Sequence, residues 1–182
     1  MTIRMYRISV IGTSGSGKTT FANKLAGILG VPHIELDTLH FEPGWVEAPK
    51  EVFRSRVREA IGADRWIVDG NYSSKARDLV WERADTIVWL DFSLAVTIGR
   101  VLRRTINRLV TGEKCCNGNR ERLGMALSRD SIILWALKTY KRHRMEYPPL
   151  LAALEQQGRQ TIRLHSPKDA DRWLARLARV RD

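Results

Sequence analysis

The sequence Gly12-Thr13-Ser14-Gly15-Ser16-Gly17-Lys18-Thr19 constrains the fold of this chain more than any other stretch. It fits G-x-x-x-x-G-K-[ST], the pattern of a phosphate-binding loop (P-loop). The apolar run at 8–11 predicts a buried strand before the loop. After the loop, apolar residues recur at helical spacing as far as Gly30, where we expect the helix to stop. The pattern therefore has the strand–loop–helix context that its mechanism requires.

The residue types in this loop suit a polyphosphate. Glycines allow the backbone to approach phosphate oxygens closely, and the loop N–H groups and the helix N-terminus attract negative charge. We expect Lys18 to reach the β- and γ-phosphates and the Thr19 hydroxyl to bind Mg²⁺. The expected nucleotide-binding residues of the loop are Gly12, Ser14, Gly15, Ser16, Gly17, Lys18, Thr19 and Thr20.

Strand and helix patterns alternate along the rest of the chain. Strands are predicted at 31–36, 65–70, 84–90 and 160–164, and helices at about 49–61, 93–110 and 120–147, with Pro148-Pro149 interrupting the last of these. Alternation of this kind is typical of a parallel sheet covered by helices on both faces. With 182 residues, we predict one three-layer α/β/α domain, 1–182, with a five-stranded parallel sheet.

Three of the predicted strands end at an aspartate, and we expect one or two of these to serve a metal. An apolar run followed by Asp, beside a P-loop strand, is typical of a Walker B segment, so Asp69 is the predicted second Mg²⁺ ligand. Asp37 follows another strand, at the edge where parallel sheets bind ligands, and we favour a functional role for it. His40 fits substrate contact and packing about equally, and Asp91 is the third strand-end acid.

The net charge of +11 is concentrated in one part of the chain. Residues 100–144 hold twelve Lys or Arg and three Asp or Glu, a net +9. Such a block attracts polyanions, among them ATP, a phosphorylated substrate, nucleic acid or an anionic membrane. Arg100, Arg104 and Arg108 recur every four residues and share a helix face, which suggests a bound anion, with a solvated face as the alternative.

Neither the cysteines nor the apolar runs indicate a special compartment. Cys115 and Cys116 are adjacent and lack C-x-x-C spacing, so a reduced pair of thiols in a loop is favoured over a metal site. The N-terminal residues are polar and basic, and no apolar run reaches the roughly 18 residues of a membrane span. We therefore expect a cytoplasmic protein without a membrane partner.

The segment Trp66-Ile67-Val68-Asp69-Gly70-Asn71-Tyr72 resembles the Asp-Gly-Phe-Pro-Arg region of adenylate kinases. The spacing from Asp91 to Arg100 and Arg104 is similar to that of the strand and paired arginines that precede the lid in those enzymes. The chain thus resembles the adenylate-kinase-like group of P-loop proteins, the nucleoside monophosphate kinases. The resemblance implies a small helical lid at about 110–146, with Arg100 packed on adenine and Arg104 on phosphates.

Within this group, three segments resemble the branch labelled DNA topology modulation protein. They are the P-loop, Leu36-Asp37-Thr38-Leu39-His40-Phe41-Glu42-Pro43-Gly44-Trp45, and the segment at 66–72. The adenylate kinase Pro at Ser14, the Thr-Gly-Asp near Asp37 and the Pro-Arg after Asp-Gly are missing here. The donor half therefore matches adenylate kinases, and the residues of the AMP site differ.

The resemblance implies an ATP-binding, Mg²⁺-dependent phosphotransferase that acts on a small-molecule or nucleotide acceptor. Lys18, Arg100, Arg104 and a lid arginine, Arg142 or Arg144, would neutralise phosphate charge, and Asp37 would orient or deprotonate the acceptor hydroxyl. The alternative is a regulatory P-loop ATPase that binds nucleic acid through residues 100–144.

Overall fold

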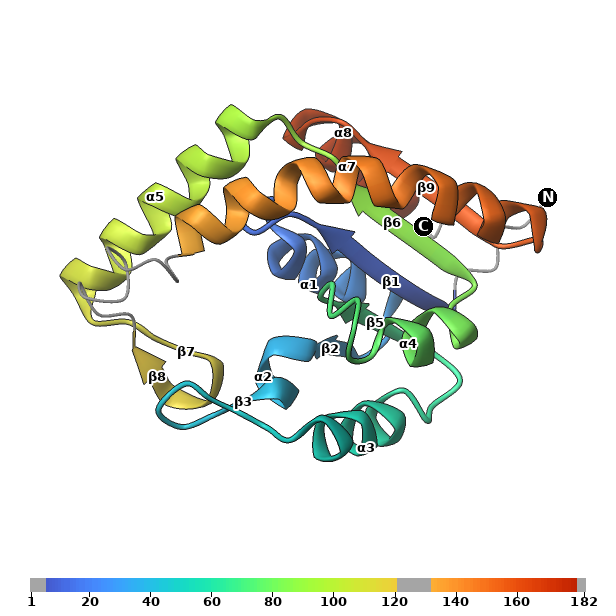
Figure 1. Ribbon diagram of the computed structural model, residues 1–182. Coiled ribbons are helices and arrows are strands. Elements are labelled where there is room, and N and C mark those ends of the chain that lie inside the picture. The colour runs from blue at the N-terminus through green and yellow to red at the C-terminus, as the bar shows by residue number, and fades with distance from the viewer. Residues whose placement is uncertain (1–5, 121–131, 180–182) are drawn as a thin grey trace.

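The computed structural model describes residues 6–120 and 132–179. Its central element is a five-stranded parallel sheet with the strand order β2-β5-β1-β6-β9 (Figure 1). The strands are β1 (Arg7–Gly12), β2 (His33–Glu35), β5 (Trp66–Asp69), β6 (Thr86–Leu90) and β9 (Gln160–Leu164). This confirms the predicted sheet, and it places the P-loop strand β1 at the centre, between β5 and β6.

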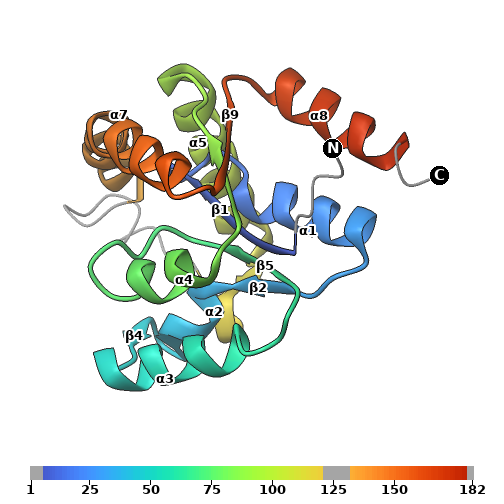
Figure 2. The same cartoon turned by 90° about the vertical axis from the view of Figure 1, so that its right-hand side faces the viewer.

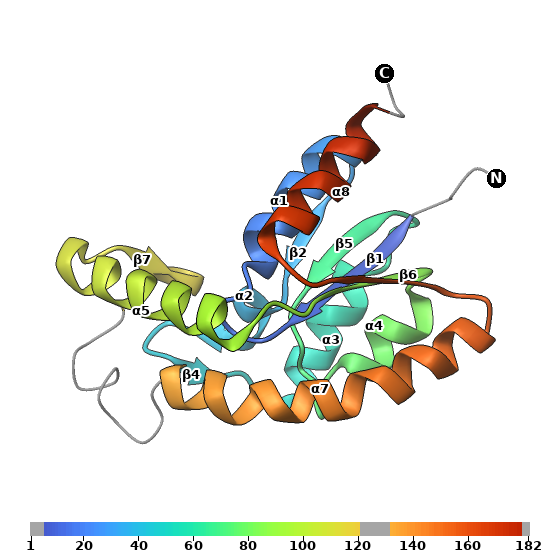
Figure 3. The same ribbon diagram turned by 90° about the horizontal axis from the view of Figure 1, so that it is seen from above.

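Helices cover both faces of this sheet, which confirms the predicted three-layer α/β/α architecture. Helices α1 (Lys18–Leu29) and α8 (Pro167–Arg179) lie together on one face (Figures 2 and 3). Helices α3 (Lys50–Ala60), α4 (Arg77–Arg83) and α7 (Ile132–Gln156) lie on the other face (Figure 3). Two separate apolar cores result, one on each side of the sheet.

Side chains of the central strands alternate between these two cores. In β6, Val88 and Leu90 pack under α1 and α8, whereas Ile87 and Trp89 pack under α4 and α7. The pleat of a strand sends successive side chains to opposite faces, and both faces are covered here. This explains why the sequence shows continuous apolar runs rather than alternating ones.

The end of the second strand differs from the prediction. Strand β2 stops at Glu35, and Asp37 lies in the short helix α2 (Leu36–His40) rather than at a strand end. The Thr38 hydroxyl donates to the Glu35 carbonyl at 2.7 Å, which satisfies a backbone acceptor that the strand no longer pairs. Local hydrogen bonding by a threonine thus turns the chain one residue earlier than its apolar pattern suggested.

Helix α5 (Leu94–Thr111) forms where it was predicted. Its buried residues are Thr97, Val101 and Thr105, whereas the larger side chains of Leu94 and Leu102 are 37% and 41% exposed. Helix α7 packs beside α5 and contributes the small buried residues Ala136 and Thr139. Small side chains on both helices allow α5 and α7 to approach each other closely. The face of α5 with these small residues is therefore the one that is buried, rather than the face with the larger leucines.

The prediction that Pro148-Pro149 interrupt the long helix was wrong, because α7 continues through them to Gln156. Two prolines remove two backbone N–H donors from the helix. Both prolines and the preceding residues Arg144 and Met145, whose carbonyls lose those partners, are solvent-exposed, so water can hydrogen-bond the freed carbonyls. Tyr147, on the buried side, holds the helix against the sheet.

Two hairpins lie beyond the carboxyl ends of the strands (Figure 1). Strand β3 (Phe41–Glu42) pairs with β4 (Val46–Glu47), and β7 (Lys114–Cys115) pairs with β8 (Asn119–Arg120) around the 3₁₀ turn η1 (Cys116–Gly118). The hairpin at 114–120 thus lies between the helices predicted at 93–110 and 120–147 and takes the first residue of the second. The predicted helix at 120–147 is confirmed from Ile132 onward, and its part at 121–131 lies outside the described residues.

No helix in residues 6–120 or 132–179 combines the length and the apolarity needed to cross a membrane.

Candidate nucleotide and acceptor site

The P-loop follows β1 and ends at the start of α1, as its sequence pattern predicts. Gly15 and Gly17 have φ angles of 83° and 87°, a region that residues with a Cβ rarely adopt. The Lys18 ammonium donates to the Gly12 carbonyl at 2.9 Å and to the Thr13 carbonyl at 3.4 Å. Burial lowers the pKa of Lys18, while the charges of Asp69 and Asp37 act in the opposite direction. A lysine held in this way lies over the loop, where phosphate would bind.

Helix α5 packs directly on the P-loop. A Cβ on Gly15 would lie 2.3 Å from the Thr97 carbonyl oxygen and 2.6 Å from Val101 Cγ2. Arg100 donates through Nη1 to the Ser16 carbonyl at 3.0 Å, and its guanidinium lies over the Phe92 ring at 5.5 Å. The predicted site residue Arg100 is therefore next to the loop. Arg104 is close enough to Lys18 to help lower its pKa.

Acidic side chains gather across from the loop, at the ends of β2 and β5. Asp69 is buried and accepts a hydrogen bond from His33 Nε2 at 2.9 Å. Glu35 accepts a hydrogen bond from the Thr19 hydroxyl, and burial together with the charges of Asp69 and Asp37 raises the pKa of Glu35. The structure thus brings together the predicted residues Thr19, Asp37 and Asp69, and it adds Glu35. The sequence signal for Glu35 was an acid two residues before Asp37, in the pattern Glu-x-Asp.

Oxygen donors in this cluster fit a nucleotide-bound Mg²⁺. Among the described residues, no three His, Cys, Asp or Glu side chains form a ready-made metal site. Mg²⁺ at nucleotide sites normally keeps several waters and uses one or two carboxylates together with phosphate oxygens, so a complete protein cage is unnecessary. The Thr19 hydroxyl beside the Glu35 carboxylate, with Asp69 nearby, meets this requirement.

Asp37 lies at the open side of the cluster and is exposed to solvent. The Tyr72 hydroxyl donates to Asp37 Oδ1 at 2.7 Å, and burial and the charge of Asp37 raise the pKa of Tyr72, so the phenol keeps its proton. Burial and Asp37 also raise the pKa of the Cys116 thiol to about 12. The surroundings of Asp37 therefore include a phenol donor, a neutral thiol and solvent, with Lys18 and Glu35 also close enough for their charges to act on it. An exposed carboxylate of this kind is suited to meeting a hydroxyl group.

Other residues near the loop have structural contacts. His40 is 2% exposed, and its ring packs 4.8 Å from those of Phe41, Phe53 and Tyr72, which supports the packing interpretation for this histidine. Asn71 is a residue that sequence reasoning missed. Its side chain accepts from the Gly12 N–H at 3.1 Å and donates to the Gly12 carbonyl at 2.8 Å.

The two arginines predicted for the lid, Arg142 and Arg144, differ in their contacts. Arg144 pairs with Asp91 at 2.7 Å, and Arg163 of β9 pairs with the same carboxylate at 2.7 Å. Asp91 thus joins β6, α7 and β9, and its partner Arg144 is engaged away from the loop. Arg142 lies half-exposed, 3.9 Å from Glu146.

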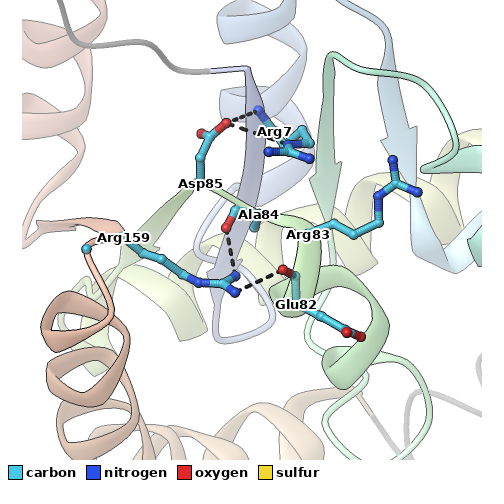
Figure 4. A pocket seen from close by; sticks show the side chains of 7 residues that line it. Arg7, Glu82, Arg83, Ala84, Asp85 and Arg159 are labelled. Atoms are coloured by element: carbon cyan, nitrogen blue, oxygen red, sulfur yellow. Dashed lines mark hydrogen bonds and ion pairs between the residues drawn. The ribbon is translucent and has the colours of Figure 1, made fainter.

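A separate cavity of about 580 Å³ lies near the opposite ends of the strands (Figure 4). Its charged groups are engaged in structural contacts. Arg159 donates to the carbonyls of Trp81, Glu82 and Ala84 at the end of α4, and Asp85 accepts from the backbone N–H of Arg7 at 2.9 Å. These contacts close the end of the sheet, and we place no function there.

No family model matches this sequence, and no curated protein matches it. Solved structures do resemble it. A shikimate kinase from Bacteroides thetaiotaomicron has a TM-score of 0.55 at 17% identity, with 97% of this chain and 98% of that chain covered. A gluconokinase from Sinorhizobium meliloti has a TM-score of 0.52 at 22% identity, with 97% of each chain covered. The likeness shows the fold: this chain has the fold of P-loop kinases.

Proposed function

We propose that this protein is an ATP-binding, Mg²⁺-dependent phosphotransferase that transfers the γ-phosphate of ATP to a small-molecule or nucleotide acceptor. The observation that carries the proposal is the arrangement of the P-loop, with Lys18 and Arg100, opposite the exposed carboxylate of Asp37. Phosphoryl transfer depends mainly on positioning and on neutralising charge, and this arrangement offers both. The small-molecule kinases that share the fold support the same class of reaction.

Each group has a role that follows from its surroundings. The loop amides and Lys18 hold the donor phosphates, since the lysine already lies over the loop and is desolvated. Thr19, Glu35 and Asp69 hold Mg²⁺, which neutralises phosphate charge when it is bound. Asp37, held by the Tyr72 hydroxyl, orients the acceptor hydroxyl and accepts its proton.

In this proposal the segment at 110–146 acts as the lid of a single domain at 1–182. Asn119 is the described residue that best supports this function, because its side chain bridges the two hairpins beyond the strand ends. It accepts from the N–H groups of Gly44 and Trp45 at 2.6 and 2.9 Å and donates to the Glu42 carbonyl at 3.0 Å. Arg104 and Arg142 would add positive charge to phosphates beneath such a lid.

The alternative is a nucleic-acid-binding regulatory ATPase, in keeping with the resemblance to the branch labelled DNA topology modulation protein. The contacts of the basic residues support the kinase instead. Arg100 hydrogen-bonds to a P-loop carbonyl, and Arg144 pairs with Asp91. Arg104 lies close enough to Lys18 for its charge to lower the pKa of that lysine. These contacts give the three arginines roles at the loop and in the fold, whereas Arg103, Lys138 and Lys141 are exposed and are the charges that a nucleic acid would have to use.

The experiment that tests the proposal is a screen for ADP release with Mg²⁺ and ATP. Acceptors would be nucleosides, nucleotides and small hydroxylated metabolites. We expect at least one of them to raise ADP release above the rate without acceptor. Stimulation by duplex DNA alone, with no response to any small molecule, would favour the ATPase.

Lys18→Ala should lower this turnover by about a hundredfold or more, since it removes a cation that holds the transferred charge. The melting temperature should stay the same, because within the described part of the chain the Lys18 ammonium hydrogen-bonds only to the Gly12 and Thr13 carbonyls of the loop. Lys24→Ala is the matched control, because Lys24 lies on the same helix and is exposed beside Asp171. Unchanged turnover in Lys18→Ala would remove the P-loop from the mechanism.

A further inference from the structure

Arg77, the first residue of α4, carries a positive charge that no described residue neutralises. Its Nη1 is shielded from solvent and has no hydrogen-bond partner, and Arg77 forms no ion pair within residues 6–120 and 132–179. The guanidinium lies over the Trp81 ring at 5.3 Å. This stacking satisfies the face of the guanidinium but leaves the N–H groups of Nη1 without an acceptor among the described residues. A shielded cationic donor without a partner destabilises a protein, so it requires an explanation.

Neighbouring arginines show what a structural role looks like in this part of the fold. Arg54 forms a bidentate pair with Asp78 at 2.7 and 2.9 Å and also donates to the Lys75 carbonyl. Arg56 pairs with Glu42 at 2.7 Å. Arg77 has no such carboxylate partner among the described residues, although it begins α4, the helix that contains Asp78.

Positive charge accumulates around the nearest titratable residue of α7. His143 is 4% exposed, and its Nδ1 lies 3.4 Å from the Thr13 hydroxyl of the P-loop. Burial lowers the pKa of His143 to about 4, with contributions from Lys18, Arg142 and Arg77. A neutral histidine supplies no negative charge. Lys18 has Asp69 and Asp37 as anionic neighbours and Arg142 has Glu146, but none of the ion pairs among the described residues includes Arg77.

The position of Arg77 connects it to the acceptor side. The Tyr72 carbonyl accepts the N–H groups of Lys75, Ala76 and Arg77 at 3.0, 3.0 and 3.2 Å, while the Tyr72 hydroxyl donates to Asp37. One residue therefore fixes both the start of α4 and the orientation of Asp37. The loop amides and Lys18 already account for the donor phosphates, so a second anion here would belong to the acceptor.

We propose that Arg77 forms an anion subsite for the acceptor, which is therefore a hydroxy compound that also carries a carboxylate or a phosphate group. This inference rests on the proposed phosphotransferase function. The acceptor hydroxyl meets Asp37, and its anionic group meets the free edge of the Arg77 guanidinium. The parallel N–H groups of a guanidinium suit two oxygens of either anion.

The test measures anion binding to the full chain saturated with Mg²⁺ and a non-hydrolysable ATP analogue, so that the P-loop is occupied. Inorganic phosphate and acetate are titrated separately, with glycerol as the neutral probe, and amide NMR shifts are followed at 71–77 and 140–147. We expect saturable shifts with at least one anion and none with glycerol. The anion that binds more tightly distinguishes a phosphorylated acceptor from a carboxylic acid.

Arg77→Gln should weaken this binding by about tenfold or more, because it removes a charge-assisted contact. Arg83→Gln is the matched control, since Arg83 ends the same helix and, among residues 6–120 and 132–179, its side chain hydrogen-bonds only to the Gly62 carbonyl. Without anion, Arg77→Gln should remain folded, because Arg77 has no ion pair to lose among the described residues and gives up only its stacking on Trp81.

Two results would overturn the inference: no saturable anion binding to the wild type, or equal binding to the wild type and Arg77→Gln. The proposed function has its own readout in the same experiment. If the wild type fails to bind the ATP analogue, the phosphotransferase proposal fails; if it binds the analogue and no anion, only the subsite fails.

Discussion

His143 shows how a single side chain in the interior can set the acid sensitivity of the molecule. It stacks on Tyr147 with ring centres 4.7 Å apart and contacts the P-loop through Thr13. Protonation would place a positive charge in a buried site that already has Lys18, Arg142 and Arg77 as neighbours. The folded protein therefore keeps this imidazole neutral at a pH at which the unfolded chain would protonate it.

We predict that stability falls as pH drops from about 6.5 toward 4, because only the unfolded state takes up the His143 proton in that range. From pH 7 to pH 5 the loss in unfolding free energy from this residue should be about 2 kcal/mol. His143→Gln should lose less stability over the same interval in denaturant titrations. His165→Gln, which changes an exposed histidine, is the control. Equal pH dependence in His143→Gln and the wild type would contradict this role.

Residues whose role is encoded locally were predictable, and those defined by distant contacts were not. The glycines at 15 and 17 determine the loop conformation, so Lys18 lies where the pattern predicted. Asp91 looked like Asp37 and Asp69 in the sequence. Its role comes from Arg144 and Arg163, 53 and 72 positions away, which no local pattern specifies.

At the scale of elements, one buried carboxylate connects three pieces of the fold. Asp91 follows β6, its partner Arg144 lies on α7, and its partner Arg163 lies on β9. The continuation of α7 beyond Pro148-Pro149 depends on the same region, because Tyr147 packs on Trp81 and Trp89 there. Tertiary packing of this kind outweighs the helix-breaking tendency of proline, and the sequence pattern alone could not predict it.

Asp91→Asn should lower the unfolding free energy by about 2 kcal/mol, because it leaves two arginines without their partner. The value is reduced from that of a fully buried pair, since the side chains of Arg144 and Arg163 are 43% and 45% exposed. The Mg²⁺ dependence of turnover should not change. Asp169→Asn, which removes a surface pair with Arg172, is the control for denaturant titrations. A larger effect on Mg²⁺ dependence than that of Asp69→Asn would reverse the metal assignment.

Asn119→Ala should separate the two hairpins beyond the strand ends. The change removes four hydrogen bonds, to Gly44, Trp45, Glu42 and Cys116. Amide exchange should become faster at 41–47 and 114–120, and exchange in β1, β5 and β6 should stay the same. Hydrogen-exchange mass spectrometry would measure both. Uniform acceleration across the sheet would instead indicate a global loss of stability.

At the scale of the whole molecule, the parallel sheet and its two cores were predictable because apolar runs and turn residues alternate along the entire chain. The lid proposed at 110–146 was inferred only from the resemblance to adenylate kinases, and it stays a prediction. Its contacts join segments far apart in the sequence, as when Asn117 donates to the Thr38 and Phe41 carbonyls, 79 and 76 positions away.

Arg104→Ala decides between the two interpretations of the basic block. In the phosphotransferase, kcat/KM should fall more than tenfold, given roughly 1.5–3 kcal/mol for a charge-assisted hydrogen bond. In a nucleic-acid-binding ATPase, ATP hydrolysis would be spared and the salt dependence of DNA binding would weaken by about one unit per lost contact. Steady-state kinetics and a salt series of DNA binding measure the two quantities. Full turnover with lost DNA binding would refute the kinase assignment.

The packing of α5 on the P-loop has a consequence for the evolution of this sequence. The general pattern G-x-x-x-x-G-K-[ST] allows any amino acid at position 15. Here Gly15 faces the Thr97 carbonyl, and a Cβ would overlap it at 2.3 Å. A library randomised at position 15 should return glycine alone, whereas one randomised at the partly exposed Ser14 should return many residues. A helix about eighty positions downstream thus restricts which substitutions the loop can accept, and the two segments must evolve together.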